Sequence, residues 1–462
     1  MDTKKLRQKI LDLAIHGKLV PQDPNDEPAS VLLERIKAEK ERLIKEGKIK
    51  RNKKSAKTSD TPHYENVPFE VPEGWCITDI GELLINRDGE RKPVSLAIRS
   101  KQNNKVYDYY GAAGVIDKVD NYLFDECLLL IGEDGANLLS RNKNNAFLAD
   151  GKYWVNNHAH VLDAIDKFIL SYVAIVINSM KLDDYITGST QPKLSQDNLN
   201  KIPIFLPPLN EQKRIMTELE RWFALIDQIE QGKVDLQETI KRAKSKVLDL
   251  AIHGELVPQN PNDEPAIELL KRINPDFTPC DNGHYENLPG SWCLTDIKSI
   301  FTINPKNKVA DDVIAGFVPM TNIADGYSNE FRFEPRLWGH IKKGFTHFAE
   351  GDIVVAKISP CLENRKSAIV TSLPNGIGAG TTELFVFRSQ CVLPEYGLYF
   401  FKSDSFINHC AGTFNGVVGQ QRVSKSIIES IKFPLPPLSE QKRIVDAVHT
   451  AFTKLDTIME SL

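Results

Sequence analysis

Apolar residues recur at alternating spacings of four and three across residues 211–251, and this series constrains the fold more than any other feature. A four-three alternation keeps one narrow seam on one side of a helix, which is typical of a helix packed along another helix. Only Lys233 interrupts the series, which otherwise comprises Ile215, Leu219, Trp222, Ile226, Ile229, Leu236, Ile240, Ala243, Val247 and Leu250. The pattern predicts a rod of roughly 60 Å that has a helical partner.

A second copy of this series is divided between the two ends of the chain. Residues 440–444 repeat the Glu-Gln-Lys-Arg-Ile of residues 211–215, and residues 11–17 match residues 248–254 as Leu-Asp-Leu-Ala-Ile-His-Gly. Joining the two ends would therefore rebuild the central helix. The sequence predicts a circularly closed, pseudo-two-fold repeat whose terminal helices form an antiparallel coiled-coil pair with the central helix and whose termini meet.

Further repeated marks divide the chain into segments. His-Tyr-Glu-Asn, Trp-Cys and Thr-Asp-Ile recur in the same order, and each copy closes on Pro-Pro-Leu at 207–209 and 436–438. We expect a helical segment with a basic linker (1–60), a first domain (61–209), a central helix and connector (210–283), a second domain (284–438) and a terminal helix (439–462). Both domains mix short β-branched runs with helical stretches, so a mixed α/β (α+β) fold is predicted for each.

The predicted strands include 127–131 and 159–162 in the first domain, and 352–358 and 383–387 in the second. Helices are expected at 168–179 and 396–406. The frames match, but Gly132-Glu133-Asp134-Gly135 is replaced by Ala356-Lys357-Ile358-Ser359 at the equivalent place. A retained frame with divergent loops indicates two modules that do the same job on different targets.

Bulk composition is that of a soluble intracellular protein, since 41% of residues are apolar, 26% are charged and no apolar signal region follows Met1. Seven cysteines without a Cys-x-x-Cys pair predict reduced thiols. The net charge of −4 gives no overall indication of nucleic acid. Residues 37–57 hold ten Lys or Arg against three Glu, which fits either a solvated helix end with a linker or a basic arm on phosphate.

Catalytic motifs are absent from the sequence. It has no Gly-x-x-x-x-Gly-Lys-Ser/Thr phosphate loop and no Asn/Asp-Pro-Pro-aromatic motif. The glycine-rich run at 376–380 lies between two predicted strands, so a loop or bulge is expected there. His158 and His160 would share one face of a strand, but neither Cys nor an acidic residue accompanies them, and no metal site is predicted.

Polar loops before each domain closes are better candidates for recognition. Aligned on the closing Pro-Pro-Leu, Gln191 corresponds to Gln420, Lys193 to Arg422 and Ser195 to Ser424. Gln suits adenine and Lys or Arg suits guanine or phosphate, whereas a helix cap followed by a solvated turn is the structural alternative. With two further polar loops, the predicted DNA-binding residues are Arg141, Asn142, Lys143, Ser189, Thr190, Gln191, Lys193, Lys357, Asn364, Arg365, Lys366, Gln420, Gln421 and Arg422.

The paired His-Gly-Lys/Glu-Leu-Val-Pro-Gln and Pro-Pro-Leu-x-Glu-Gln-Lys-Arg-Ile segments, with Thr-Gly-Ser-Thr-Gln-Pro-Lys-Leu, resemble those of the specificity (S) subunit of Type I restriction-modification systems. The resemblance implies two target-recognition domains joined by antiparallel helices, with no catalysis and no cofactor in this chain. It also implies double-stranded DNA, two methyltransferase (M) subunits that use S-adenosylmethionine, and restriction (R) subunits that use ATP as partners. Residues 413–422 depart from the family's Thr-Gly-Ser-Thr-Gln loop.

The leading hypothesis is that each domain reads one half of an asymmetric, interrupted DNA site in the cytoplasm, while the helices set the gap and dock the methyltransferase. A coiled-coil scaffold whose domains bind protein is the alternative from another class. An enzyme with an unrecognised site is the third.

Overall fold

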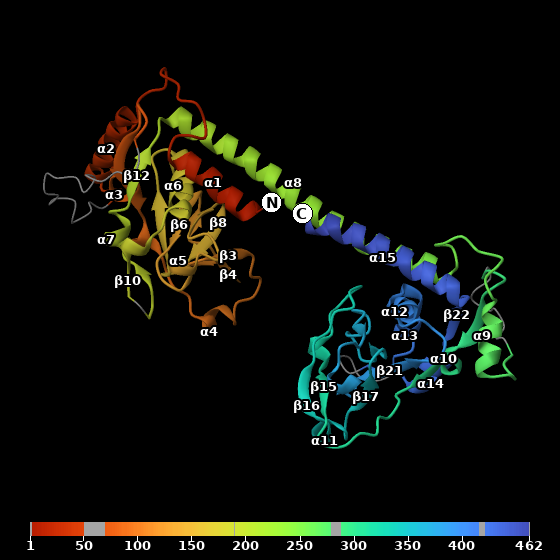
Figure 1. Ribbon diagram of the computed structural model, residues 1–462. Coiled ribbons are helices and arrows are strands. Elements are labelled where there is room, and N and C mark those ends of the chain that lie inside the picture. The colour runs from red at the N-terminus through yellow and green to blue at the C-terminus, as the bar shows by residue number, and fades with distance from the viewer. Residues whose placement is uncertain (1, 50–69, 189, 279–287, 415–420, 462) are drawn as a thin grey trace. The chain divides into compact units, whose positions relative to one another are not determined.

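The computed structural model describes residues 2–49, 70–188, 190–278, 288–414 and 421–461. It divides into two units, Met1–Gln231 and Gly232–Leu462 (Figure 1). The boundary falls within one continuous helix, α8 (Leu209–Ile252), of 44 residues. The predicted central helix is therefore confirmed, and its two parts belong to different units. Among the described helices, none combines the length and the apolar character needed to cross a membrane.

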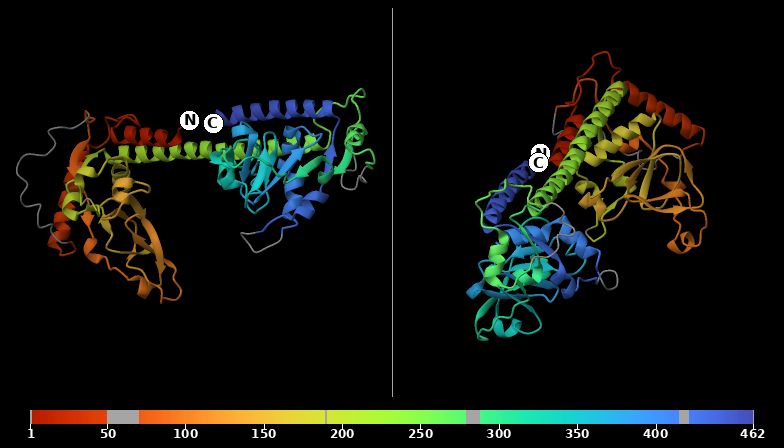
Figure 2. Two further views of the ribbon diagram at one scale, coloured as in Figure 1. Left: turned by 60° about the horizontal axis from the view of Figure 1, so that its bottom comes forward. Right: turned by 90° about the vertical axis from the view of Figure 1, so that its right-hand side faces the viewer.

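In the first unit, α1 (Thr3–Ile15) runs antiparallel to the beginning of α8, as two views show (Figures 1 and 2). Arg7, near the start of α1, pairs with Asp227 and Glu230. Gln22, beyond the end of α1, instead reaches Glu211 at the start of α8. Ile10 and Ala14 share a buried cluster with Ile215, Leu219 and Ile226, so apolar burial holds this helix pair together.

In the second unit, α15 (Leu438–Glu460) runs antiparallel to the last part of α8. Lys244 pairs with Asp456 and lies 5.1 Å from the ring centre of Phe452. At the other end of the pair, Gln259 donates to Glu440 over 2.7 Å. The buried residues shared by these helices include Leu248, Ile252, Ile444, Val448 and Phe452.

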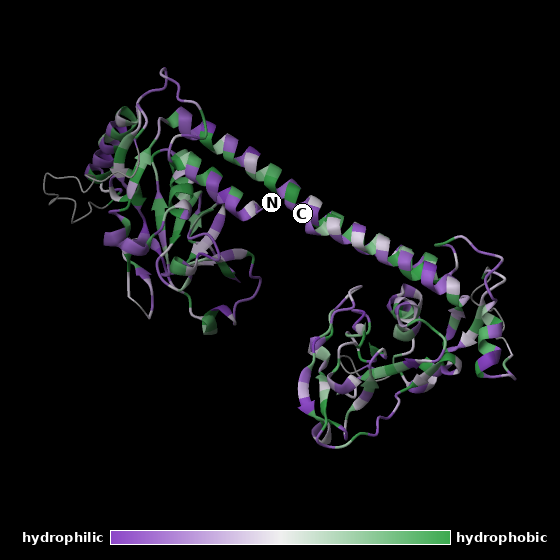
Figure 3. Cartoon of the chain, viewed as in Figure 1, coloured by the Kyte–Doolittle hydropathy of each residue, from purple (hydrophilic) through white to green (hydrophobic). Residues whose placement is uncertain are grey.

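The apolar seam of α8 differs from the predicted one. Trp222 and Ile229 belong to the four-three series but remain 39% and 38% exposed, and no residue from 227 to 239 is buried. The buried Leu248, Ala251 and Ile252 lie outside the series. Polar and apolar residues are interspersed along the whole helix (Figure 3). Packing is therefore concentrated near both ends of α8, where the globular parts also cover it.

The globular part of the first unit contains two four-stranded sheets. The inner sheet has the order β2-β9-β6-β7 and the outer sheet has the order β4-β3-β8-β5. The inner strands are β2 (Ile85–Asn86), β6 (Leu128–Gly132), β7 (Ala146–Ala149) and β9 (Ala159–Asp163), and the outer strands are β3 (Tyr107–Gly111), β4 (Gly114–Val119), β5 (Phe124–Asp125) and β8 (Lys152–Val155). Every residue of β6 is buried, as its unbroken apolar run predicts for a central strand.

Helix α6 (Lys167–Ser179) packs on the inner sheet and starts at Asp166, which accepts from the backbone N–H of Phe168. Two short strand pairs complete the unit, β1 (Cys76–Asp79) with β12 (Pro203–Leu206) and β10 (Ile186–Thr187) with β11 (Lys193–Leu194). The other helices are α2 (Ala29–Lys45), α3 (Ile80–Leu83), α4 (Leu96–Arg99), α5 (Asn137–Ser140) and α7 (Gln196–Leu199).

The second unit repeats this topology, with the inner order β14-β21-β18-β19 and the outer order β16-β15-β20-β17. Its inner strands are β14 (Phe301–Ile303), β18 (Ile353–Ala356), β19 (Ser367–Ile369) and β21 (Leu384–Ser389), and its outer strands are β15 (Ile314–Val318), β16 (Glu334–Leu337), β17 (Thr346–Ala349) and β20 (Ile377–Gly380). β13 (Cys293–Asp296) pairs with β22 (Lys432–Leu435). The helices are α9 (Ala266–Ile273), α10 (Ile297–Ile300), α11 (Trp338–Ile341), α12 (Pro394–Lys402), α13 (Asp404–Ala411) and α14 (Lys425–Ser430).

Most predicted elements are confirmed within a few residues, and two are wrong. The expected helix at 396–406 is divided into α12 and α13 at Ser403, whose side chain caps α13 by accepting from Phe406. The glycine-rich run at 376–380 forms strand β20 instead of a loop. A side chain at Gly378 would meet the ring of Phe348 at 2.2 Å, so glycine is needed there for close packing within the sheet.

Candidate nucleic-acid interface

In the first unit, the segment that precedes the closing Pro-Pro-Leu is hydrogen-bonded to the residues that follow the buried strand β6. The first return loop comprises residues 187–195 and contains the β10–β11 turn. Leu194 donates its backbone N–H to Glu133 over 2.8 Å, and Gly135 donates to Pro192 over 3.0 Å. Gly188 has a φ of +86°, and a side chain there would meet the carbonyl oxygen of Gln191 at 2.6 Å. This turn therefore requires glycine.

The second unit builds the same arrangement at the end of β18. The second return loop comprises residues 416–424, of which 421–424 are described. Val423 donates to the carbonyl oxygen of Lys357 over 3.0 Å, and Ser359 donates to Gln421 over 2.9 Å. Because the bridges Asp134–Lys193 and Ile358–Arg422 occupy matching positions, the predicted correspondence of Lys193 with Arg422 is confirmed.

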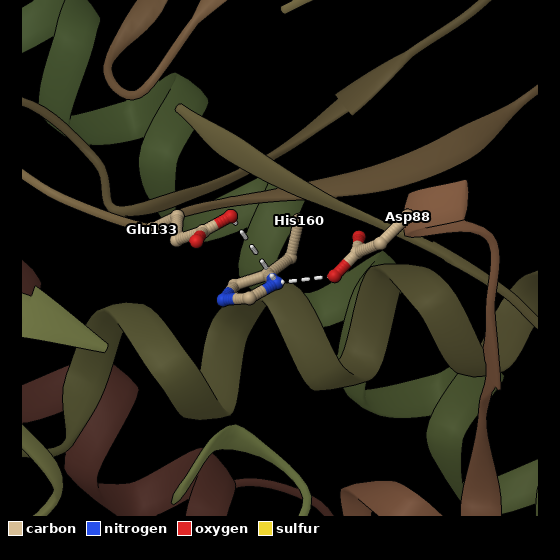
Figure 4. Close-up of side chains that lie close together, drawn as sticks. All are labelled: Asp88, Glu133 and His160. Atoms are coloured by element: carbon tan, nitrogen blue, oxygen red, sulfur yellow. Dashed lines mark hydrogen bonds and ion pairs between the residues drawn. The ribbon is translucent and has the colours of Figure 1, made fainter. Parts of the chain in front are cut away.

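A layer of charged side chains adjoins the first return loop, and Figure 4 shows three residues of this layer, Asp88, Glu133 and His160. His160, which is 1% exposed, has its Nδ1 2.7 Å from Asp88 and its Nε2 2.8 Å from the carbonyl oxygen of Leu194. Arg91 pairs with Glu133 at 2.7 Å and with Asp88 at 3.4 Å. Lys193 approaches the second oxygen of Glu133 at 3.2 Å. The return loop is thus tied to this layer through both its backbone and a side chain.

The two carboxylates of this layer are ionised at neutral pH. Burial alone would raise the pKa of Asp88, but the hydrogen bond and charge of His160, with the charge of Arg91, outweigh it and lower the pKa. Burial likewise opposes the ionisation of Glu133, and Arg91, His160 and Lys193 together lower its pKa. Ion pairs therefore stabilise the charged forms.

The second unit has a different set of side chains at the matching place. Arg422 binds both carboxylate oxygens of Glu383, at 2.8 and 3.0 Å. The hydrogen bond from Arg422 lowers the pKa of Glu383 despite partial burial. Lys357 lies 5.5 Å from the centre of the Phe385 ring. The two units thus share the same backbone hydrogen bonds at this place but differ in their charged side chains.

The structure brings several of the predicted DNA-binding residues to the return loops. Thr190, Gln191 and Lys193 are exposed on the first loop. Gln421 and Arg422 lie on the second, and Lys357 is at the adjoining strand end. Ser189 and Gln420 lie outside the described residues. Ser195 and Ser424 cap α7 and α14 as predicted, since each accepts from a backbone N–H three residues on.

Other predicted residues lie away from these loops. Arg141 donates to the carbonyl oxygen of Asn178 at the end of α6, while Asn142 and Lys143 beside it are exposed. Arg365 donates to Asp404 and to the carbonyl oxygen of Lys402. Lys366 donates to the carbonyl oxygens of Met320 and Ile323, and Asn364 is exposed. Arg141, Arg365 and Lys366 thus support the fold, and DNA contact by these residues stays a prediction.

Sequence reasoning missed the polar residues around the loops, namely Asp88, Arg91, Glu133, His158 and Glu383. The acidic partners that His158 and His160 lacked in the sequence are present in the fold, because Asp134 lies 2.8 Å from His158 and Asp88 lies 2.7 Å from His160. Asp88 is 72 residues from His160 in the chain. One signal in the sequence could have pointed to these residues: Glu133 is aligned with Lys357, a residue of opposite charge, although the flanking strands match.

Comparison with known proteins supports this two-fold organisation. The family model described as the Type I restriction modification DNA specificity domain matches residues 72–238 and 289–461. The chain belongs to this family. Its two matches coincide with the two globular parts and the helical segments that follow them.

Curated relatives carry the same description. The chain is 39% identical over 279 residues to the Type I restriction enzyme EcoAI specificity subunit of Escherichia coli, an alignment that covers 55% of this chain and 46% of that protein. It is 41% identical over 251 residues to the EcoEI specificity subunit of Escherichia coli, with 50% and 41% covered. The matched region thus spans about half the length of these relatives.

A solved structure from the type I R-M system has the same fold. It superposes with a TM-score of 0.51 at 15% identity, and the match covers 85% of this chain and 94% of the other. At this identity the likeness supports the fold alone.

Proposed function

We propose that this chain is the DNA sequence-specificity subunit of a Type I restriction-modification complex. In this role, each α/β domain reads one half of an asymmetric bipartite site. The observation that carries the proposal is the duplicated strand-end frame, on which Lys193 and Arg422 occupy matching positions among unlike neighbours. Because the two domains share a backbone arrangement but present different side chains, they suit two half-sites of different sequence.

Readout by the return loops rests on side chains of suitable chemistry. Gln191 offers an amide for bidentate contact with adenine, and Lys193 and Arg422 offer donors to guanine or phosphate. Arg422 is held by two hydrogen bonds to Glu383, which fixes the plane of its guanidinium group. A fixed donor loses less conformational freedom on binding than a mobile one.

The partners follow from the same role. Two methyltransferase subunits that bind S-adenosylmethionine would dock on the helices, and restriction subunits that use ATP would join the larger assembly. The chain itself contributes recognition and no catalytic step, and it meets chromosomal DNA in the cytoplasm. Continuous helix α8 links the two units and, in this proposal, determines the gap between the half-sites.

The test is DNA binding by the chain assembled with the methyltransferase subunits proposed as its partners. The target is first located by mapping methylated adenines. Labelled duplexes that carry this target then compete with duplexes altered in one half or the other. Site-selective, salt-sensitive binding that is weakened by changes in either half is the expected result. Equal affinity for all duplexes would instead favour a scaffold whose domains bind protein.

A further inference from the structure

Asp88, Glu133 and His160 have the residue types of a metal site, since their ligand atoms all lie within 4.8 Å of one another. In this structure, neighbouring protein groups engage all three side chains. Both oxygens of Glu133 are held, by Arg91 and Lys193. The oxygens of Asp88 accept from the backbone N–H of Val161 and from His160. His160 also uses its Nε2 to donate to a carbonyl oxygen, so the hydrogen bonds of this group are made within the protein.

The same atoms form a mechanical connection to the first return loop. Because a carbonyl oxygen can only accept, the Nε2 of His160 carries a proton and donates to Leu194. The opposite nitrogen faces Asp88, so the ring joins the segment after β2 to strand β11. Arg91 extends the connection, since it also donates to the carbonyl oxygen of Ala159 over 2.6 Å.

The second unit has an apolar side chain in the place of His160. Gly132 pairs with Ala159 in one unit as Ala356 pairs with Leu384 in the other, so His160 corresponds to Phe385. Glu133 and Lys357 make equivalent backbone bonds, to His158 and Glu383 respectively. Phe385 is 3% exposed and cannot bond to the return strand through its side chain. The two loops are therefore supported by different chemistry.

We propose that His160 and Arg91 are positioning residues that fix the first return loop for base recognition, and that in the second unit Phe385 takes the place of His160 while Glu383 holds Arg422. This inference rests on the proposed function. Leu194 is the backbone neighbour of Lys193, so the bond from His160 fixes the origin of that side chain. Supporting side chains of different shape would then present Lys193 and Arg422 differently to their half-sites.

The decisive variant is His160→Phe, which installs the side chain that the second unit uses at the same strand position. The experiment uses the full chain with its methyltransferase subunits and a target located by mapping methylated adenines. It compares the Kd for this target with the Kd for duplexes in which one base pair is changed, either in the first half or in the second. His160→Phe is expected to reduce this discrimination about tenfold or more in one half and to leave the other half unchanged. Glu383→Gln should show the converse, which assigns each half to its unit.

Matched variants separate positioning from stability. Arg91→Gln breaks the same layer and should reproduce the loss, whereas Arg99→Gln removes an equally buried arginine that pairs with Asp117 in the outer sheet. Both arginine side chains are 13% exposed. The Arg99 variant should lower the melting temperature without changing discrimination. His160→Gln keeps an N–H near the Nε2 position and should restore part of what phenylalanine loses.

Several outcomes overturn the inference. Unchanged discrimination in folded His160→Phe, or an equal loss in both halves, would show that the layer does not position one loop. If His160→Phe does not fold, Arg91→Gln decides in the same way. A rise in melting temperature with Zn²⁺ or Mn²⁺ that His160→Phe abolishes would identify a metal site instead. Absence of any site preference in the unaltered complex would refute the proposed function and the inference with it.

Discussion

The indole N–H of Trp75 donates to the carboxylate of Glu211 over 3.0 Å, across 136 residues of chain. The other oxygen of Glu211 accepts from Gln22 at 2.8 Å. One buried carboxylate thus joins the connector after α1, the start of the globular part and the start of α8. In the second unit Glu440 accepts from Gln259 at 2.7 Å, so this connection to the connector is also duplicated.

Glu211→Gln should destabilise the first unit by about 1–3 kcal/mol. Glu211 accepts hydrogen bonds from Trp75 and Gln22, one on each carboxylate oxygen. In glutamine, an NH₂ group replaces one of these oxygens and would face one of the two donors without a hydrogen bond. Burial already raises the pKa of Glu211, so the site is costly even when it is well bonded. Denaturant unfolding of the purified chain measures the change. Adding Trp75→Phe should recover part of the loss, and strict additivity of the two changes would contradict a shared bond.

Ile226→Asp should destabilise the first unit by about 3 kcal/mol or more, since it places a charge in the cluster that joins α1 to α8. Ile229→Asp is the matched control, because Ile229 is 38% exposed and the change should cost little. Thermal melting distinguishes them. Equal effects of the two variants would contradict the packing described for this helix pair.

Lys402 gives a pH dependence with a defined sign. Burial lowers the pKa of Lys402 to about 7, and its Nζ donates to the carbonyl oxygens of Gly326 and Arg365. Between about pH 7 and 10.5 the unfolded chain binds the proton and the folded chain does not. Stability should therefore rise with pH in this window, by up to about 1.4 kcal/mol per unit.

Lys402→Met should flatten this rise. The free energy of unfolding, measured by denaturant titration from pH 7 to 10, provides the comparison. A variant that keeps the full slope of the unaltered protein would show that another group is responsible.

Lys193→Ala and Arg422→Ala should each weaken recognition of one half-site by about 1–3 kcal/mol if the side chain reads a base edge. The two variants should affect opposite halves. Competition binding with half-site variants measures this. A uniform loss for all sequences, with a smaller dependence on salt, would indicate phosphate contact instead.

Local patterns were sufficient to predict the central helix α8, helix α6, the buried inner strands and the repeat. The unbroken apolar run at β6 predicted a buried strand, and the four-three series of α8 predicted a helix but not which of its residues are buried, because such patterns depend on near neighbours alone. The caps Ser195 and Ser424 were predictable for the same reason, because a cap acts over three residues.

Predictions failed where distant residues decide the outcome. Polar loop position alone did not distinguish Lys193 from Arg365, whose guanidinium bonds to Asp404 inside the domain. Gly378 forms part of a strand because Phe348 and Gly316 pack against it from other strands. His160 acquired its partners from Asp88 and Leu194, which only the tertiary fold brings together.

Removing residues 231–237, which leaves Asp227 and Glu230 in place, should change the gap between the half-sites without changing the bases read. This stretch of α8 has no buried residue, so both helix pairs retain their packing. Seven residues correspond to about 10 Å of helix, or about three base pairs. Selection of bound duplexes from a library with variable gaps measures the result. An unchanged gap would contradict a spacing role for α8.

The central claim is that two unlike domains read two unlike half-sites. Single-molecule sequencing of methylated adenines in cells that carry the chain with its methyltransferase tests this most directly, with cells that lack only this chain as the control. The account predicts a two-part target with different half-sites and a fixed gap, present only with the chain. A single continuous palindrome, or the same methylation in both cells, would contradict it.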